Sequence, residues 1–162
     1  MEKDIGKFLR LPVKTMQNLE IPEGSYEKKR NQYYSTKILK TILEDVPSDA
    51  VKMLGVIDKD LCIPILTFVF GEAQLGGTAA LVSLTRLRQE FYGLDGDPAV
   101  FYERIHKESL HELGHTYGLV HCSSVDCLMY LSNTVMDVDK KGRIFCRSCQ
   151  EALISKKEYG RI

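Results

Sequence analysis

The chain has 162 residues, 22 basic and 22 acidic side chains and a hydrophobic fraction of 44%, which is the composition of one globular domain. Its balanced charge gives no reason to expect a nucleic acid or an anionic membrane surface as a partner. No apolar stretch approaches the roughly 20 residues of a membrane span, and the charged N-terminus lacks the apolar run of a signal peptide, which together predict a cytoplasmic protein.

The first half of the chain predicts alternating strands and helices. Strands are expected at residues 8–13, 51–57, 66–70 and 79–84. A helix is expected over about residues 27–45, where Ile38 and Ile42 belong to an apolar stripe. The basic run Lys28-Lys29-Arg30 is interpreted as the solvated start of that helix.

A longer helix is expected to begin at Asp97, where an N-cap residue precedes Pro98, and to continue to Tyr117 without a proline. One stripe of this helix is expected to pack inside, and it contains Tyr102, His106, Leu110, Leu113 and Tyr117. His106 is therefore expected to point away from a site on the opposite face.

Residues 111–121 read His-Glu-Leu-Gly-His-Thr-Tyr-Gly-Leu-Val-His and fit the zinc-binding pattern H-E-x-x-H-x-x-G-x-x-H. On a helix, His111 and His115 lie only about 40° apart around the axis, so they can bind one metal ion. Gly118 can adopt the left-handed turn that would end the helix and bring His121 back as third ligand. Three imidazoles leave one position of a zinc ion open for water.

Glu112 is rotated by about 100° from His111, so its carboxylate can reach a water molecule on the metal without binding the metal itself. The expected reaction is hydrolysis of a peptide bond, with Glu112 as general base toward that water. The alternative is that His-Glu-x-x-His arises by chance on an amphipathic helix. The correct spacing of Gly118 and His121 argues against chance.

Four of the five cysteines lie within residues 122–149. Cys122 and Cys127 have four intervening residues, whereas Cys146 and Cys149 have two, a pattern typical of a structural zinc site. A pair of disulfides is the alternative, and it would need an oxidising compartment. Cys62 lies in an apolar run and is interpreted as a buried thiol of the core.

The histidine motif, the four cysteines and Met129 together resemble the archaemetzincins, a branch of the metzincin zinc peptidases, and residues 68–73 are also similar to that family. The resemblance implies that His111, His115 and His121 bind a catalytic zinc and that Glu112 is the catalytic acid and base. It implies a second, structural zinc bound by Cys122, Cys127, Cys146 and Cys149. The resemblance also implies that Met129 is the methionine beneath the metal site. Without the resemblance, the apolar sequence around Met129 indicates only ordinary core packing.

The expected fold is α+β (mixed α/β), with a twisted mixed sheet packed on a backing helix and on the active-site helix. One metzincin-like domain would span residues 1–162, with an N-terminal subdomain 1–118 and a small zinc-clipped subdomain 119–162. In metzincins, the strand before the active-site helix is commonly an exposed edge strand that pairs with substrate. By resemblance, Ala80, Leu81, Val82 and Ser83 are the candidates for it, although an edge strand without a ligand remains the alternative.

The sequence therefore predicts a zinc metallopeptidase with two Zn²⁺ ions per chain and a peptide or protein substrate. It leaves aminopeptidase and endopeptidase activity equally open. The alternative is a catalytically latent two-zinc protein that binds peptides without cleaving them. Because no pattern indicates an oligomer, a monomer is expected.

Overall fold

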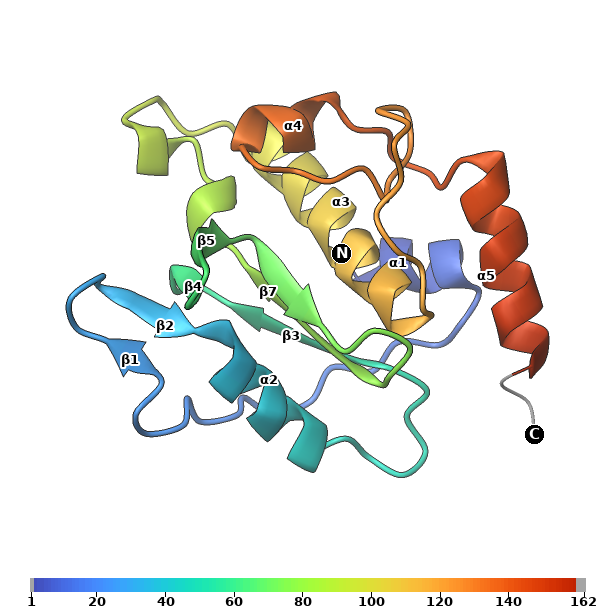
Figure 1. Ribbon diagram of the computed structural model, residues 1–162, viewed down its shortest axis with the longest axis horizontal. Helices are drawn as coiled ribbons and strands as arrows, with labels where there is room; N and C mark the ends of the chain where they lie inside the picture. The colour runs from blue at the N-terminus through green and yellow to red at the C-terminus, as the bar shows by residue number, and fades with distance from the viewer. Residues whose placement is uncertain (1, 160–162) are drawn as a thin grey trace.

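The structure, a computed structural model, describes residues 2–159 and contains two mixed sheets with helices around them (Figure 1). The first sheet has the order β1 (Tyr26–Glu27), β2 (Gln32–Tyr34), β4 (Leu61–Ile63) and β5 (Leu66–Val69). The second has the order β3 (Met53–Ile57), β7 (Ala79–Ser83) and β6 (Gly71–Ala73). The helices are α1 (Glu2–Leu9), α2 (Ser35–Glu44), α3 (Pro98–Thr116), α4 (Val135–Lys140) and α5 (Arg147–Tyr159), with 3₁₀ turns η1 (Thr85–Leu87) and η2 (Glu90–Tyr92). The expected α+β fold is confirmed.

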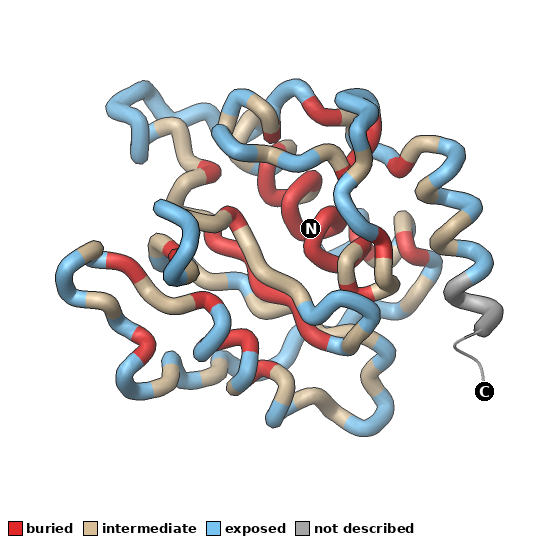
Figure 2. The backbone as a smooth tube through the Cα atoms, viewed as in Figure 1, coloured by how far each residue is buried: buried red, intermediate tan, exposed pale blue. Residues whose placement is uncertain are grey.

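Strand β7 is the buried centre of the second sheet, between a parallel partner, β3, and an antiparallel partner, β6. All five of its residues are buried (Figure 2). Leu81 shares a hydrophobic cluster with Ile42 of α2, whereas Val82 shares one with Ile105 of α3, so helices cover both faces of this strand. The prediction that Ala80–Ser83 is an edge strand is therefore wrong, because both edges of β7 are already paired.

The N-terminus is helical where residues 8–13 were expected to form a strand. Ile5 and Leu9 are four residues apart on α1, and both are buried in a cluster that contains Leu113 of α3. This helical spacing of apolar residues decides the local structure. Arg10, with φ 55°, follows the helix in the left-handed region.

The helix expected over residues 27–45 is present only from Ser35 onward. The preceding residues form the hairpin β1–β2, with Asn31 in the left-handed conformation at its turn (φ 51°). The first turn of α2 is bound to a strand that is distant in the sequence. The hydroxyls of Ser35 and Thr36 both donate hydrogen bonds to the carboxylate of Glu72 on β6. A contact over this distance in the chain could not be read from local sequence.

Helix α3 begins as expected, since the Asp97 side chain accepts hydrogen bonds from the backbone N–H groups of the second and third residues of the helix. The predicted inward stripe is confirmed for Leu110 and Leu113, but Tyr102 is 64% exposed. His106 packs edge-on against the ring of Phe8, with 6.4 Å between ring centroids. Cys62 on β4 is a fully buried free thiol, as expected. Among the described residues, no helix is long and apolar enough to cross a membrane.

Candidate active site

Three histidines gather at the C-terminal end of α3. The helix supplies His111 and His115, and the segment after its end supplies His121. Their ring centroids lie 4.7–5.3 Å apart, and one nitrogen atom of each ring lies within 4.8 Å of those of the other two. The spacing predicted from the sequence therefore does bring these three side chains together.

The turn that brings His121 back depends on Gly118, which has φ 79°. Its N–H donates to the carbonyl of His115 at 2.8 Å, and the N–H of Leu119 donates to the carbonyl of Gly114 at 3.1 Å. These two bonds cap the last carbonyls of α3 in the manner of a glycine-terminated helix. The predicted role of Gly118 as the end of the helix is confirmed.

Backbone carbonyls fix the orientation of the two helical imidazoles. Nδ1 of His111 donates to the carbonyl of Leu128 at 2.9 Å, and Nδ1 of His115 donates to the carbonyl of Leu119 at 2.7 Å. Because a carbonyl only accepts, both rings keep an unprotonated Nε2, and these two atoms lie 3.2 Å apart. Burial also lowers the pKa of all three histidines and so favours the neutral form. Three neutral imidazoles, two of them with lone pairs oriented by backbone carbonyls, fit a zinc ion.

Glu112 is buried beside these histidines and lies against the backbone of strand β6. Burial raises its pKa well above the usual value, and the neighbouring carboxylate of Glu108 adds to this. A Cβ atom at Gly71 would lie 2.6 Å from Cγ of Glu112 and 2.5 Å from the carbonyl oxygen of Leu81. Only glycine therefore allows β6 to approach Glu112 so closely. Sequence reasoning noted the family-like segment around Gly71 but assigned the glycine no role.

Met129 is completely buried under α3. A Cβ atom at Gly114 would lie 2.6 Å from the Met129 sulfur, so the thioether packs on the turn of helix between His111 and His115. The carbonyl of Met129 accepts from the N–H of Cys122 at 2.9 Å. The segment that contains Met129 thus contacts both α3, which carries His111 and His115, and Cys122, which follows His121.

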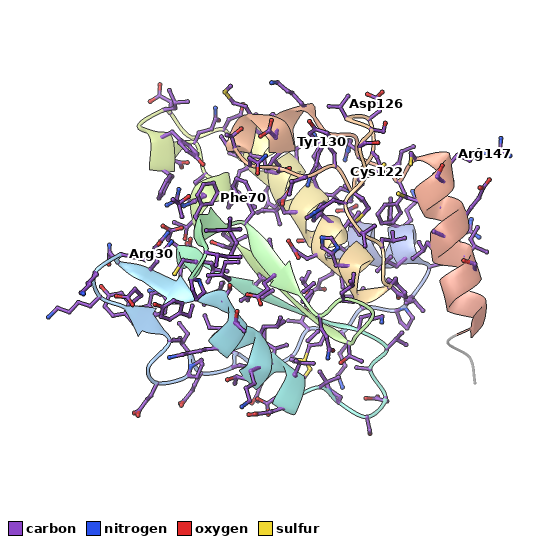
Figure 3. All side chains as sticks on the ribbon, in the orientation of Figure 1. Arg30, Phe70, Cys122, Asp126, Tyr130 and Arg147 are labelled. Carbon is purple, nitrogen blue, oxygen red and sulfur yellow. The ribbon has the colours of Figure 1, made fainter. Side chains whose placement is uncertain are left out.

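The four cysteines singled out in the sequence form a second cluster, in which all Sγ atoms lie within 4.8 Å of one another. Figure 3 shows Cys122 on the loop between α3 and α4. All five cysteines are free thiols, so the alternative of two disulfides is not observed. The Cys127 sulfur accepts from the N–H groups of Met129 and Cys146 at 3.4 and 3.3 Å. A backbone hydrogen bond from Cys149 is the main cause that lowers the pKa of Cys146 to about 7. Four sulfurs at these distances fit a tetrahedral metal ion.

A cleft of about 600 Å³ lies in front of the histidines. One wall is the continuous run Leu66–Ala73, which contains β5 and β6, and the opposite wall includes residues 131–133 after the Met129 segment. Helix α3 contributes four residues to the cleft, namely Glu108, His111, Glu112 and His115. Sequence reasoning did not identify Glu108, although its place one helical turn before His111 puts it on the same face.

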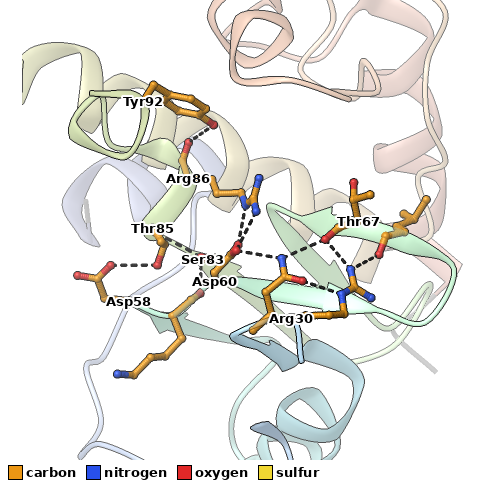
Figure 4. Close-up of polar contacts among 11 residues, drawn as sticks. Arg30, Asp58, Asp60, Thr67, Ser83, Thr85, Arg86 and Tyr92 are labelled. Atoms are coloured by element: carbon orange, nitrogen blue, oxygen red, sulfur yellow. Dashed lines mark hydrogen bonds and ion pairs between the residues drawn. The ribbon is translucent and has the colours of Figure 1, made fainter. Parts of the chain in front are cut away.

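The wall strand β5 is held by a polar network (Figure 4). The Arg30 guanidinium donates to the carbonyls of Leu66 and Thr67, both at 2.5 Å, and Gln32 donates to the Thr67 carbonyl at 3.0 Å. Gln32 also donates to Asp60, which in turn forms a two-pronged ion pair with Arg86. The interpretation of Arg30 as part of a solvated basic run is therefore wrong, because its side chain binds β5.

Comparison with known families matches residues 5–155 to Peptidase family M54. The archaemetzincin of Methanocaldococcus jannaschii is 42% identical over 161 residues, which cover 98% of this chain and 86% of that protein. The chain belongs to peptidase family M54. Its expected membership of the archaemetzincins is confirmed, and the protein is a zinc metallopeptidase.

Solved archaemetzincin structures share the fold of this M54 member. The structure from Methanopyrus kandleri is similar with a TM-score of 0.87 and 37% identity, covering 97% of this chain and 83% of that one. The structure from Archaeoglobus fulgidus, complexed with malonate, is similar with a TM-score of 0.80 and 37% identity, covering 93% of this chain and 87% of that one.

Proposed function

We propose that the protein hydrolyses peptide bonds with a catalytic zinc held by His111, His115 and His121 and with Glu112 as general base. The observation that carries this proposal is the convergence of three imidazoles, two of them oriented by backbone carbonyls, on one point beside a buried carboxylate. Zinc bound there would supply Lewis acidity, which activates water and polarises a substrate carbonyl.

Glu112 would carry the proton through the reaction. Its carboxylate takes a proton from the water whose oxygen attacks the carbonyl carbon, and then delivers that proton to the leaving amine nitrogen as the C–N bond breaks. The backbone of Gly71 limits where this carboxylate can lie.

Strand β6 replaces β7 as the proposed partner of an extended substrate. In the antiparallel register with β7, Glu72 is opposite Leu81, and the N–H of Ser83 donates to the carbonyl of Phe70. Along an antiparallel strand, the backbone N–H and C=O groups of successive residues point alternately toward and away from the partner strand. The groups of Gly71 and Ala73 therefore point away from β7, toward the open edge of the sheet and the cleft. A peptide that pairs with this edge would pass directly over Glu112.

The cysteine cluster would hold a second, structural zinc, with no position left open for chemistry. It would clip the start of α5, through Cys146 and Cys149, to the chain just after His121. Free thiols of this kind persist in a reducing compartment such as the cytoplasm. They agree with the cytoplasmic location predicted from the sequence, which stays a prediction.

The test of the proposal is the Glu112→Gln variant in a screen of peptides with free and with blocked N-termini. Activity should fall by about 10²–10⁴-fold with zinc content unchanged, because only the proton carrier is lost. Glu103→Gln is the matched control and should keep activity, because Glu103 is on the same helix but does not line the cleft and pairs with Arg143 and, at 3.7 Å, with Lys107. Undiminished cleavage by Glu112→Gln would refute the assignment of the base. Peptide binding without cleavage by the unaltered protein would favour the latent alternative.

A further inference from the structure

Glu108 is a buried carboxylate in the wall of the active-site cleft, where the hydrolytic mechanism gives it no role. It lies one helical turn before His111 and lines the cleft together with His111, Glu112 and His121. The residue is 2% exposed, so its carboxylate is almost completely removed from bulk water. A carboxylate in such a place needs a positively charged or hydrogen-bonding partner.

Its partner is the ammonium group of Lys141, which lies 2.5 Å from a carboxylate oxygen of Glu108. The Lys141 side chain is 0% exposed and does not line the cleft. The lysine therefore lies behind the carboxylate, and it is Glu108 that faces the space where a substrate would bind.

The lysine is held in this place by the attachment of α4 to α3. Arg104 forms an ion pair with Asp139 at 2.7 Å, and Lys107 donates to the carbonyls of Val138 and Asp139. Lys141 follows directly at the C-terminal end of α4. The ion pair is thus built into the contact between two helices and does not depend on a flexible surface side chain.

Stability does not explain the ion pair, because replacing a buried ion pair by well-packed apolar side chains is often neutral or stabilising. Its position suggests recognition instead. Glu108 offers hydrogen-bond acceptors to the cleft, and the buried Ser132 hydroxyl of the opposite wall has no hydrogen-bond partner among the described residues. Such a lining fits a ligand that donates hydrogen bonds.

We propose that Glu108, backed by Lys141, binds a cationic group of the substrate residue next to the cleaved bond. This inference rests on the proposed peptidase function and specifies its substrate class. The cation is either a basic side chain or a free N-terminal ammonium, since both donate charged hydrogen bonds to a carboxylate. Lys141 and Glu108 form an ion pair without a hydrogen bond, and Oε1 of Glu108 has no hydrogen-bond partner among the described residues, so its lone pairs are available to a substrate donor.

The first experiment compares matched peptides with the unaltered, zinc-loaded protein. One series places arginine, its neutral analogue citrulline or norleucine on either side of the cleaved bond, and the other compares free with acetylated N-termini. At least one cationic member should have a kcat/KM higher than its neutral counterpart by about tenfold or more, as expected for a charged hydrogen bond in a buried site. The series that shows the preference identifies the source of the cation. Equal rates within every pair would overturn the proposal.

The second experiment measures binding, so that it does not depend on turnover. The dissociation constants of the same peptides are measured by calorimetry with three proteins. The first carries Glu112→Gln alone, and the second carries Glu112→Gln and Glu108→Gln. The third carries Glu112→Gln together with both Glu108→Met and Lys141→Met. The Met pair removes both charges and avoids an unpaired lysine, which protects the fold if Glu108→Gln is unstable. Both combinations should lose the preference for the cation, whereas combination with Glu103→Gln should keep it. A preference that survives loss of the Glu108 carboxylate contradicts the proposal.

The two experiments also separate this inference from the proposed function. If no peptide is cleaved but cationic peptides bind better through Glu108, hydrolysis is wrong and the binding site stands. If peptides are cleaved without regard to charge, the peptidase stands and the role of Glu108 is wrong.

Discussion

Gly71 shows how a residue without a side chain can control the position of the proposed general base, Glu112. Its importance comes from the distance between two elements that are far apart in the sequence, β6 and α3. The histidine spacing could be predicted because it depends only on helix geometry and one glycine turn. The need for glycine at position 71 depends on the packing of β6 against Glu112 of α3, which cannot be predicted from the residues around Gly71.

We predict that Gly71→Ala lowers kcat by about 10²-fold or more, because the new methyl group displaces the Glu112 carboxylate from its position. Zinc content should stay as in the unaltered protein. Steady-state kinetics and elemental analysis provide the measurement. Ala73→Gly, two residues along the same strand, controls for weakening of β6 and should cost much less activity. Equal loss in both variants would mean that only the strand is affected.

A second prediction concerns the contact between Gly114 and Met129. Gly114→Ala should destabilise the protein by about 1–2 kcal/mol despite the better helix propensity of alanine, because its methyl group overpacks against a fully buried sulfur. Met129→Ala should also destabilise it, by leaving a cavity. In the double variant the alanine methyl occupies part of that cavity, so the double loss should be smaller than the sum. Urea unfolding of the four proteins measures this coupling, and strict additivity would show that the two residues do not share the space.

At the scale of elements, the sequence predicted those segments whose structure is decided locally. Helix α3 has its N-cap, its proline and its terminal glycine within the segment itself, and all three function as expected. The hairpin β1–β2 was missed because its turn depends on a left-handed Asn31 and its pairing extends to β4. Strand β7 was correctly expected as a strand, but its position in the sheet is set by partners on both sides.

Arg30 is the side chain through which the hairpin supports the cleft wall. We predict that Arg30→Met destabilises the protein by about 2 kcal/mol, since charged hydrogen bonds to the carbonyls of Ile63 on β4 and of Leu66 and Thr67 on β5 are lost. The KM for peptides should rise at the same time, because β5 continues into the proposed substrate strand β6. Lys28→Met, an exposed neighbour in the same basic run, should change neither quantity. Thermal unfolding and steady-state kinetics check both effects, and a stable Arg30→Met protein would show that the network is dispensable.

At the scale of the whole molecule, the histidine cluster and the cysteine cluster share one short segment. The carbonyl of Leu128 orients His111, the carbonyl of Met129 accepts from the N–H of Cys122, and Cys127 directly precedes these two residues. The sequence could predict only that His121 and Cys122 are adjacent. The link through residues 127–129 appears once the chain after α3 has folded back under the helix.

This shared segment predicts that damage to the cysteine cluster reaches the histidines. Cys149→Ser should reduce the zinc content from two ions per chain to one and lower Tm by roughly 10 °C, because a structural zinc contributes its binding energy to folding. Peptidase activity should also fall, since Leu128 would no longer hold His111 firmly in its orientation. Elemental analysis, calorimetry and kinetics on one preparation measure the three effects. Cys62→Ala, a buried thiol outside the cluster, is the control for loss of a cysteine and should keep both zinc ions. Full activity in a Cys149→Ser protein that has lost one zinc would show that the two sites are independent, and the carbonyl of Leu128 would then be held by the buried packing of its own side chain.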